Sequence, residues 1–321
     1  MTRVAVVLMN LGGPDSLASV QPFLLNLFSD PAIIGLPGFL RVPLARFVAW
    51  RRAPVARDIY ARLGGRSPLL GNTEAQARAL EAALGPGYRC FVAMRYWHPL
   101  SAATAREVAE WAPDEIVCLP LYPQFSTTTT ASSLAAWQIA AARQGLIRPT
   151  HVVRCYPCEQ GLVEAIATLV GPALEAASGS GKPPRLLLTA HGLPKRMVRG
   201  GDPYPDQVER TAAAVVAALA RPELDWRVCY QSRVGPLEWI GPATDEEIRR
   251  AGEDGVALVV APISFVSEHS ETLVELDLDY RHLAEVAGVT YYHRVAAVGV
   301  EPRFIGSLAT LVKRARAGAP A

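Results

Sequence analysis

The sequence predicts an α/β protein with two similar halves, each a parallel four-stranded sheet flanked by helices, and a cleft between the halves. Apolar runs of strand length occur four times in each half, and helix-length amphipathic segments separate them. This alternation is typical of parallel sheets. Half of the 321 residues are hydrophobic and 19% are charged, so the chain can bury two cores of ordinary size.

The strands are expected at residues 4–8, 89–94, 115–119, 151–155, 185–190, 227–230, 256–261 and 290–295. We expect the first domain to cover 1–150 and the second 151–321. A run rich in Gly, Ser and Pro at 176–184 is an alternative linker, and the helix expected at 159–177 fits either half.

Equivalent strands of the two halves lead into similar polar turns. The first strands end in Asn10-Leu11-Gly12-Gly13-Pro14 and in His191-Gly192-Leu193-Pro194. The carboxyl ends of parallel strands are where α/β proteins bind their ligands. His191, which follows the apolar run 186–190, is therefore the leading candidate for chemistry.

Composition excludes several classes of protein. The net charge of +2 and the scattered basic residues give no reason to expect a nucleic-acid partner. The first apolar run is followed too soon by a turn for a signal peptide, and no later run reaches roughly 18 uncharged residues, so we expect a cytoplasmic protein that does not span a membrane. The five cysteines are expected to be free, although Cys155 and Cys158 have the spacing of a redox or metal pair.

The first half contains an additional segment, residues 20–66, that has no counterpart in the second half. It combines apolar residues such as Phe39, Phe47 and Trp50 with interleaved arginines. Two interpretations stay open: a helix that lies on an anionic membrane or forms the lip of an apolar pocket, and an extra helix packed on the domain.

An acidic segment follows the third strand of the second half. Ser267 is expected as an N-cap, and the carboxylates of Glu268, Glu271, Glu275 and Asp279 are expected to share one face of an α-helix. Such a row is usually a solvated surface, but its position at a strand end also suits a divalent cation. His191 with Glu271 would provide a histidine and a carboxylate for one metal, such as Fe²⁺, or for one proton.

These motifs together resemble the ferrochelatase family. The resemblance covers nearly the whole chain and rests on the strand-end turns above and on the runs 60–68, 95–99, 122–126, 201–204, 231–236 with Trp239, and 267–273. It implies a chelatase-type fold of two Rossmann-like domains around a porphyrin cleft.

The resemblance also implies roles for individual residues. His191 and Glu271 would be the catalytic and metal-site residues, and Glu275 would continue an acidic path for iron or protons. The porphyrin pocket would be lined by Leu11, Ser67, Arg95, Tyr96, Tyr122, Trp239 and Phe265. Arg95 would hold a propionate because its planar fork suits a carboxylate, and segment 20–66 would be the membrane-facing lip.

The implied activity is a lyase reaction, the insertion of Fe²⁺ into protoporphyrin IX with release of two protons, as the final step of haem biosynthesis. A pocket that bends the ring would favour this step, and His191 would accept a pyrrole proton or bind iron first.

Relatives that use coproporphyrin carry a tyrosine where this chain has Leu11, so protoporphyrin is the expected substrate. Thr127 stands where some relatives have a cluster ligand and the C-terminal end has no cysteine, so no iron–sulfur cluster is expected. The substrates are the expected partners of a monomer that touches the inner face of the membrane through its lip.

Other functions are weighed against this one. A coproporphyrin III ferrochelatase or a chelatase for another tetrapyrrole, such as sirohydrochlorin, would share the fold. A porphyrin- or haem-binding protein without catalysis would be expected to have lost His191, Glu271 or Glu275, which are all present. A nucleotide-binding protein would need a phosphate loop, and the turn after the first strand lacks one.

Overall fold

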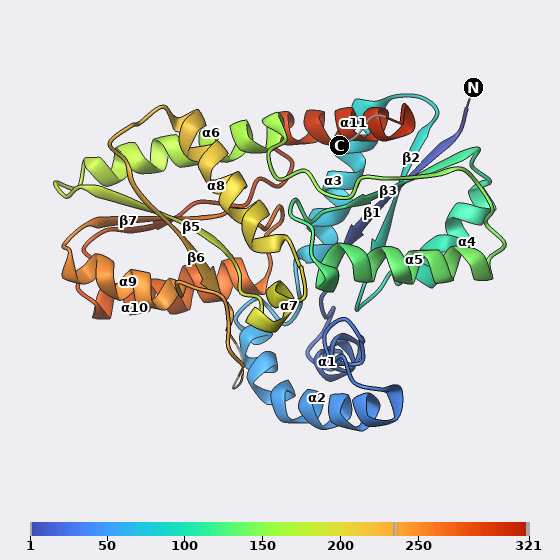
Figure 1. Ribbon diagram of the computed structural model, residues 1–321, viewed down its shortest axis with the longest axis horizontal. Helices are drawn as coiled ribbons and strands as arrows, with labels where there is room; N and C mark the ends of the chain where they lie inside the picture. Colours follow the sequence, from blue (N-terminus) through green and yellow to red (C-terminus); the bar gives the residue numbers. More distant parts are fainter. Residues whose placement is uncertain (1, 234, 236, 319–321) are drawn as a thin grey trace. The chain divides into compact units, whose positions relative to one another are not determined.

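The computed structural model describes residues 2–233, 235 and 237–318 (Figure 1). Val234 and Pro236 of the expected motif and the last three residues lie outside the described residues. The described chain divides into two compact units, one made of the residues up to Cys155 together with those after Ser307, and the other of Tyr156–Ser307.

The first unit is built on a parallel sheet with the strand order β2-β1-β3-β4. Its strands are β1 (Val4–Asn10), β2 (Tyr88–Met94), β3 (Glu115–Pro120) and β4 (Thr150–Val152). All seven residues of β1 are buried, because helices cover both faces: α4 (Ser101–Trp111) and α5 (Ser132–Arg143) lie on one side and α3 (Leu69–Leu84) on the other (Figure 1). Trp137 of α5 fills the core beneath β1.

The second unit repeats this arrangement with the strand order β6-β5-β7-β8, also parallel. Its strands are β5 (Pro184–His191), β6 (Asp225–Gln231), β7 (Ala257–Pro262) and β8 (Tyr292–Arg294), and its helices are α6 (Gln160–Ser178), α7 (Lys195–Arg199), α8 (Tyr204–Leu219), α9 (Thr244–Glu253) and α10 (Tyr280–Val286). The expected fold class, two α/β halves with four parallel strands each, is confirmed.

Each unit has a π-helical segment after its third strand. These are η1 (Thr127–Ala131) and η2 (Glu271–Asp279), in which N–H groups bond to carbonyls five residues earlier, as from Tyr280 to Glu275. The expectation of an α-helix capped by Ser267 is wrong. Ser267 lies four residues before η2 begins and is buried. Ser270, which directly precedes Glu271, makes no side-chain cap.

The segment 20–66 of the first unit forms α1 (Val20–Phe28) and α2 (Gly38–Ala61), which pack together (Figure 1). In α2 the small side chains of Ala45, Ala49 and Ala53 are buried. Large apolar side chains are exposed instead, with Phe39 at 76% and Trp50 at 62%. The packed face therefore uses little of the apolar surface that α2 carries.

The last helix, α11 (Pro302–Arg316), begins in the second unit and ends in the first. Arg316 binds both carboxylate oxygens of Glu115 at 2.8 Å and donates to the hydroxyl of Tyr88 at 2.7 Å. The sequence-based division had placed all residues after 150 in the second domain, because nothing in the local sequence indicates this ion pair.

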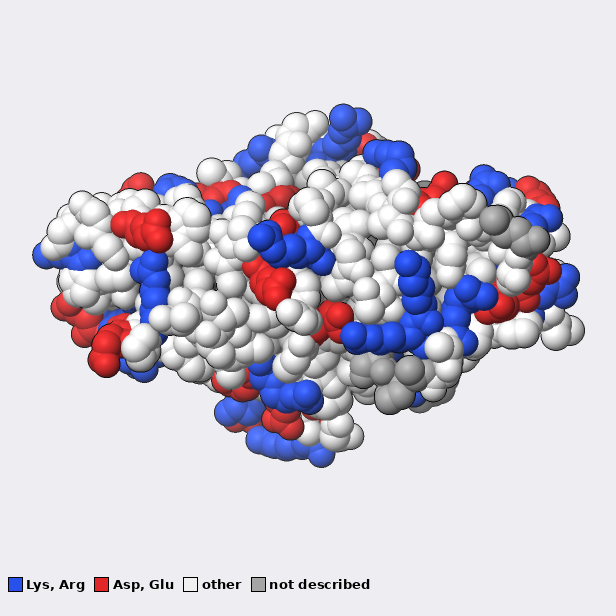
Figure 2. All heavy atoms as spheres, turned by 90° about the horizontal axis from the view of Figure 1, so that it is seen from above, with Lys and Arg blue, Asp and Glu red and all other residues white. Residues whose placement is uncertain are grey.

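Among the residues that the structure describes, one helix, α6, is long and apolar enough by composition to cross a membrane. It was not singled out from the sequence because Glu164 and Glu175 interrupt its apolar run. Leu162, Ile166 and Leu174 of α6 are buried in the second unit, as in the core helix of an α/β domain. On the face shown in Figure 2, basic and acidic side chains are interspersed, in keeping with the net charge of +2.

Candidate active site

The candidate site of the second unit lies at the carboxyl edge of its sheet. His191 is the last residue of β5 and pairs in register with Gln231, the last residue of β6. Strand β7, on the other side of β5, leads into η2. Three adjacent strands therefore deliver their polar exits to one place, as expected for parallel strands.

His191 and Glu271 form a close pair, as the sequence suggested. Nδ1 of His191 lies 2.8 Å from Oε2 of Glu271, and 43% and 27% of the two side chains are exposed. Burial disfavours the charged imidazole, but the Glu271 carboxylate outweighs it and raises the pKa of His191 above its usual value. Burial likewise opposes the charge on Glu271, yet His191 lowers the pKa of this carboxyl to about 2.

Glu275 lies behind this pair and is held by several donors. Its carboxylate accepts hydrogen bonds from the Ser232 N–H at 2.8 Å, from Nε2 of Gln231 at 3.1 Å, from the Tyr280 hydroxyl at 3.1 Å and from the Ser232 hydroxyl. Burial and the charge of Glu271 nevertheless raise the pKa of Glu275. Two neighbouring carboxyls whose pKa values are driven apart are typical of acid–base sites.

Ser232 connects the two carboxylates and was not identified from the sequence. Its hydroxyl lies within hydrogen-bond distance of Glu275 and 3.3 Å from Oε2 of Glu271, but it has one hydrogen to donate. The hydroxyl can therefore donate to only one of the two carboxylates at a time. The left-handed backbone of Ser232, φ 62°, was not recognisable in the motif, although its place after β6 was.

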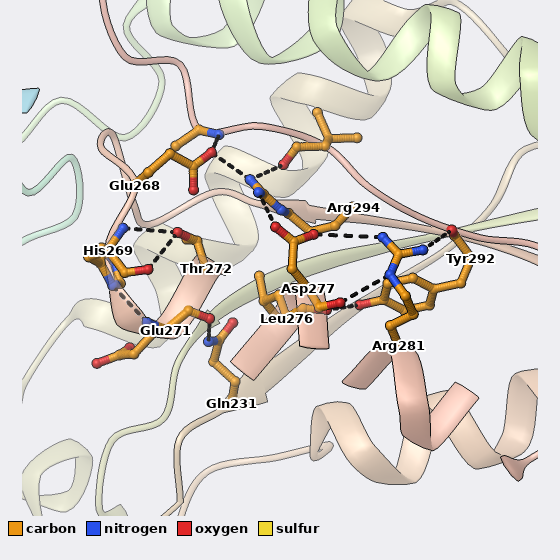
Figure 3. Close-up of polar contacts among 12 residues, drawn as sticks. Gln231, Glu268, His269, Glu271, Thr272, Leu276, Asp277, Arg281, Tyr292 and Arg294 are labelled. Atoms are coloured by element: carbon orange, nitrogen blue, oxygen red, sulfur yellow. Dashed lines mark hydrogen bonds and ion pairs between the residues drawn. The ribbon is translucent and has the colours of Figure 1, made fainter. Parts of the chain in front are cut away.

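His269 is a second imidazole beside the pair. Its Nδ1 accepts the Glu271 N–H at 3.1 Å (Figure 3), and Phe265 packs edge-on against its ring at 4.5 Å. Burial lowers the pKa of His269 below its usual value. His269 is therefore neutral, with the proton on Nε2, because Nδ1 acts as an acceptor.

The described residues contain no group of three or more His, Cys, Asp or Glu side chains arranged to hold a metal ion. His191 and Glu271 offer two ligands. A cation bound there takes its remaining ligands from water or from a substrate, which suits a metal that passes through the site better than one that stays.

Trp239 lies beside His191, because its ring packs against Gly192, the residue that follows His191. A Cβ added to Gly192 would lie 3.2 Å from the Trp239 ring. It also borders an open pocket of about 540 Å³ within the second unit. Glu275 and Asp279 line the same pocket. A polar cavity therefore leads to the inner carboxylate of the site.

The expected site residues of the first unit lie at the equivalent edge of its own sheet. Arg95 and Tyr96 follow β2, but both bind Asp30, at 2.7 Å and 2.8 Å. Ser132 donates to the same carboxylate. Tyr96 is fully buried, so the expectation that its side chain lines a pocket is not met. Asp30 was missed, because it lies in a loop after α1 with no motif around it.

The other expected residues of the first unit are partly exposed. Leu11 follows β1 and packs against the cluster of α1 and α2. Ser67 lies against Gly13, where a Cβ would be 2.5 Å from the Ser67 hydroxyl. Tyr122 follows β3, 3.4 Å from the hydroxyl of Ser133. All three therefore lie next to the carboxyl ends of β1 and β3.

The sequence matches the family profile Ferrochelatase over residues 3–316. The chain belongs to the ferrochelatase family. Curated relatives with this name include proteins from Caulobacter vibrioides, 56% identical over 99% of this chain and 92% of theirs, and from Phenylobacterium zucineum, 57% identical over 96% and 90%. A third, from a Wolbachia of Drosophila simulans, is 47% identical over 96% and 98%. Ferrochelatases are porphyrin metal chelatases, so this chain is an enzyme of haem biosynthesis.

Solved structures support the same fold. SirB from Bacillus subtilis with Fe³⁺ matches with a TM-score of 0.54 at 12% identity, covering 99% of this chain and 97% of its own. The sirohydrochlorin chelatase SirB in complex with cobalt, from B. subtilis subspecies spizizenii, matches with a TM-score of 0.56 at 10% identity, covering 98% and 95%. At these identities the likeness concerns the fold alone.

Proposed function

We propose that this ferrochelatase inserts Fe²⁺ into protoporphyrin IX, releasing two protons, and that His191 and Glu271 carry the reaction. The observation that carries the proposal is their 2.8 Å contact at the carboxyl edge of the second sheet. With Glu271 ionised, Nδ1 of His191 holds the proton of this hydrogen bond. Nε2, which has no hydrogen-bond partner among the described residues, is left to face the substrate.

His191 takes the first pyrrole proton at Nε2 in this proposal. The imidazolium that forms is stabilised by the adjacent Glu271 carboxylate, much as a carboxylate stabilises a catalytic histidine in other enzymes. A bent porphyrin, whose nitrogens point out of the ring plane, would present its N–H groups to this nitrogen. Iron then binds at the pyrrole nitrogen that has lost its proton, with Glu271 as its nearest carboxylate.

The second proton requires a second acceptor, and Glu275 fits this role. Its raised pKa makes it able to take up a proton that Glu271, with a pKa of about 2, does not hold. The Ser232 hydroxyl between the two carboxylates supplies the link. The pocket beside Glu275 and Asp279 then gives the proton a way to solvent.

Two features favour protoporphyrin over coproporphyrin as the substrate: the number of carboxylates on the porphyrin, and the leucine at position 11, where relatives that use coproporphyrin carry a tyrosine. Coproporphyrin has four carboxylates where protoporphyrin has two, and each needs a cation or a donor. Arg95, the expected propionate partner, already binds Asp30 and Ser132. The porphyrin contacts expected for Leu11, Ser67, Arg95, Tyr122, Trp239 and Phe265 remain predictions.

We further propose that the enzyme binds the cytoplasmic surface of a membrane through α2, as a monomer. The exposed Phe39, Phe47 and Trp50 and the interleaved arginines suit an anionic bilayer surface.

No iron–sulfur cluster is proposed: Cys118 and Cys229 are buried in strands, and burial raises the pKa of both thiols to about 12, which disfavours the thiolate that a cluster needs.

The test is a metal-insertion assay with Fe²⁺ or Zn²⁺ and either protoporphyrin IX or coproporphyrin III. We expect turnover with protoporphyrin and a kcat/KM at least about tenfold lower with coproporphyrin. Turnover with neither porphyrin would contradict the enzymatic proposal, and a preference for coproporphyrin would overturn the substrate assignment alone.

A further inference from the structure

Arg294, the last residue of β8, is a nearly buried cation outside the candidate site. Its side chain is 8% exposed. Nη1 lies 2.5 Å from Oε1 of Glu268, and Nη2 binds Oδ2 of Asp277 (Figure 3). One guanidinium thus bridges two carboxylates, which its planar fork is suited to do.

The two carboxylates flank the acidic residues of the site along the chain. Glu268 lies before η2 and Asp277 lies within it, and Glu271 and Glu275 fall between them. Glu268 is fixed further by the N–H of Ala297, at 2.9 Å. Arg294 therefore holds the segment on both sides of the residues that contact His191 and Ser232.

Other contacts from the same strand support this attachment. The Tyr292 hydroxyl donates to the Leu276 carbonyl at 2.6 Å. Arg281 donates to the carbonyls of Asp277 at 3.0 Å and Tyr292 at 3.1 Å. Strand β8 is thus also joined to the segment directly through the Tyr292 hydroxyl and indirectly through the Arg281 side chain of α10 (Figure 3).

The segment needs such support for two physical reasons. A π-helix is less favourable than an α-helix and persists where tertiary contacts maintain it. Like charges four residues apart, as Glu271 and Glu275 are, also destabilise the turn that joins them. A fixed cation that binds carboxylates on both sides of this turn counters both effects.

We propose that Arg294 is a positioning residue: by holding Glu268 and Asp277 it sets the π-helical register of η2 and so places Glu271 against His191 and Glu275 against Ser232. Its effect on catalysis rests on the proposed function. Its effect on the conformation of η2 does not.

The chain offers a matched control in Arg185. This arginine lies in the same unit, is 6% exposed and also bridges two carboxylates, Asp225 at 2.6 Å and Asp254 at 2.7 Å. It stands near the start of β5, at the opposite end from His191. Arg294→Met and Arg185→Met therefore remove similarly buried arginines that each bridge two carboxylates, although the partners of Arg185 are more exposed. Only the bridge of Arg294 reaches the site.

Hydrogen–deuterium exchange with mass spectrometry measures the conformation directly. In Arg294→Met we expect peptides covering 268–280 to exchange about tenfold faster or more, and in Arg185→Met no change there. Arg294→Lys, which reaches one carboxylate at a time, should be intermediate. For Zn²⁺ insertion we expect kcat to fall about 10- to 100-fold in Arg294→Met, with the KM for porphyrin unchanged within about twofold.

Unchanged exchange at 268–280 in Arg294→Met, or equal losses of kcat in both methionine variants, would overturn the proposal, because the arginine would then act through general stability. A wild-type protein that inserts no metal but shows the expected exchange pattern would refute the proposed function and leave the positioning role supported. If Arg294→Met does not fold, the triple variant Glu268→Gln, Asp277→Asn, Arg294→Met removes all three charges together, and the same outcomes decide.

Discussion

The backbone N–H of Ser232 donates to Oε1 of Glu275 at 2.8 Å from a left-handed conformation, φ 62°. Residues other than glycine adopt this conformation at a cost. In Ser232 this cost is offset by two hydrogen bonds, because its N–H and its hydroxyl both bind the carboxylate of Glu275.

Replacing Ser232 by alanine should keep the N–H bond and remove the hydroxyl between Glu271 and Glu275. We expect kcat for Zn²⁺ insertion to fall about tenfold, within the range of lost proton-transfer groups, with little change in melting temperature. Ser232→Gly is the control, because it removes the same hydroxyl and relieves the backbone. Equal losses in both variants assign the effect to the hydroxyl, whereas full activity in either one would remove the relay from the mechanism.

The pH dependence of kcat/KM should report His191. Its pKa is raised by Glu271, and the imidazole must be neutral to accept a proton, so activity should rise with pH through a value above the usual pKa of histidine. Glu271→Gln removes the carboxylate that raises the pKa of His191. In this variant the rise of the residual activity with pH should therefore occur at lower pH. A limb at the same pH in both proteins would show that His191 is not the group that titrates.

The same pair predicts a window of stability. A raised histidine pKa means that the stabilisation is complete below the unfolded-state pKa of His191 and is lost as pH rises through the folded-state value. The lowered pKa of Glu271, about 2, means that its contribution is present above the usual carboxyl pKa of 4.5 and is lost as pH falls toward about 2. Thermal unfolding should therefore show the advantage of wild type over Glu271→Gln in mildly acidic buffer, and a smaller one above the His191 pKa.

Membrane contact through α2 can be separated from folding. Phe39→Ser with Trp50→Ser should abolish flotation with anionic liposomes without lowering the melting temperature, because both side chains are largely exposed. Val286→Ser is the matched control, since Val286 is an apolar residue 72% exposed on α10. Flotation that is lost equally in the control, or kept in the double variant, would contradict the proposed surface.

Asp30 should be a main determinant of stability in the first unit. It is 2% exposed and accepts hydrogen bonds from Arg95, Tyr96 and Ser132. Asp30→Ala leaves the Arg95 cation without its partner and should cost about 3 kcal/mol of unfolding free energy in denaturant titrations. Asp114→Ala, which removes an exposed carboxylate bound to the Arg3 N–H, should cost far less, and similar losses in the two variants would refute the importance of the cluster.

The sequence was sufficient for the parts of the fold that depend on local patterns. All eight strands overlap the predicted runs, but the edge strands β4 and β8 are only three residues long and lack buried residues. The central strands were the easier ones to predict, because a central strand of a parallel sheet is buried on both faces and must be apolar. The meeting of His191 and Glu271 was also predictable, since both follow neighbouring parallel strands and so reach the same edge.

The remaining features depend on contacts between distant segments. Spacings of three and four residues fit an α-helix, and the π-helical register of η2 comes with bonds from β8, above all from Arg294, which no local pattern reveals. The hydroxyl of Tyr96 binds Asp30, which lies in a loop far away along the chain, and no local pattern reveals this contact. The exposure of Trp50 and Phe39, by contrast, follows from alanines that occupy the packed face of α2.

The central claim, that His191 and Glu271 carry metal insertion, is tested most directly by His191→Ala. His282→Ala, at an exposed histidine on α10 in the same unit, is the control. The initial rate of Zn²⁺ insertion into protoporphyrin IX should be lost in His191→Ala and unchanged in His282→Ala, while fluorescence titration gives a porphyrin Kd within about threefold of wild type in both. Wild-type rates in His191→Ala would contradict the account.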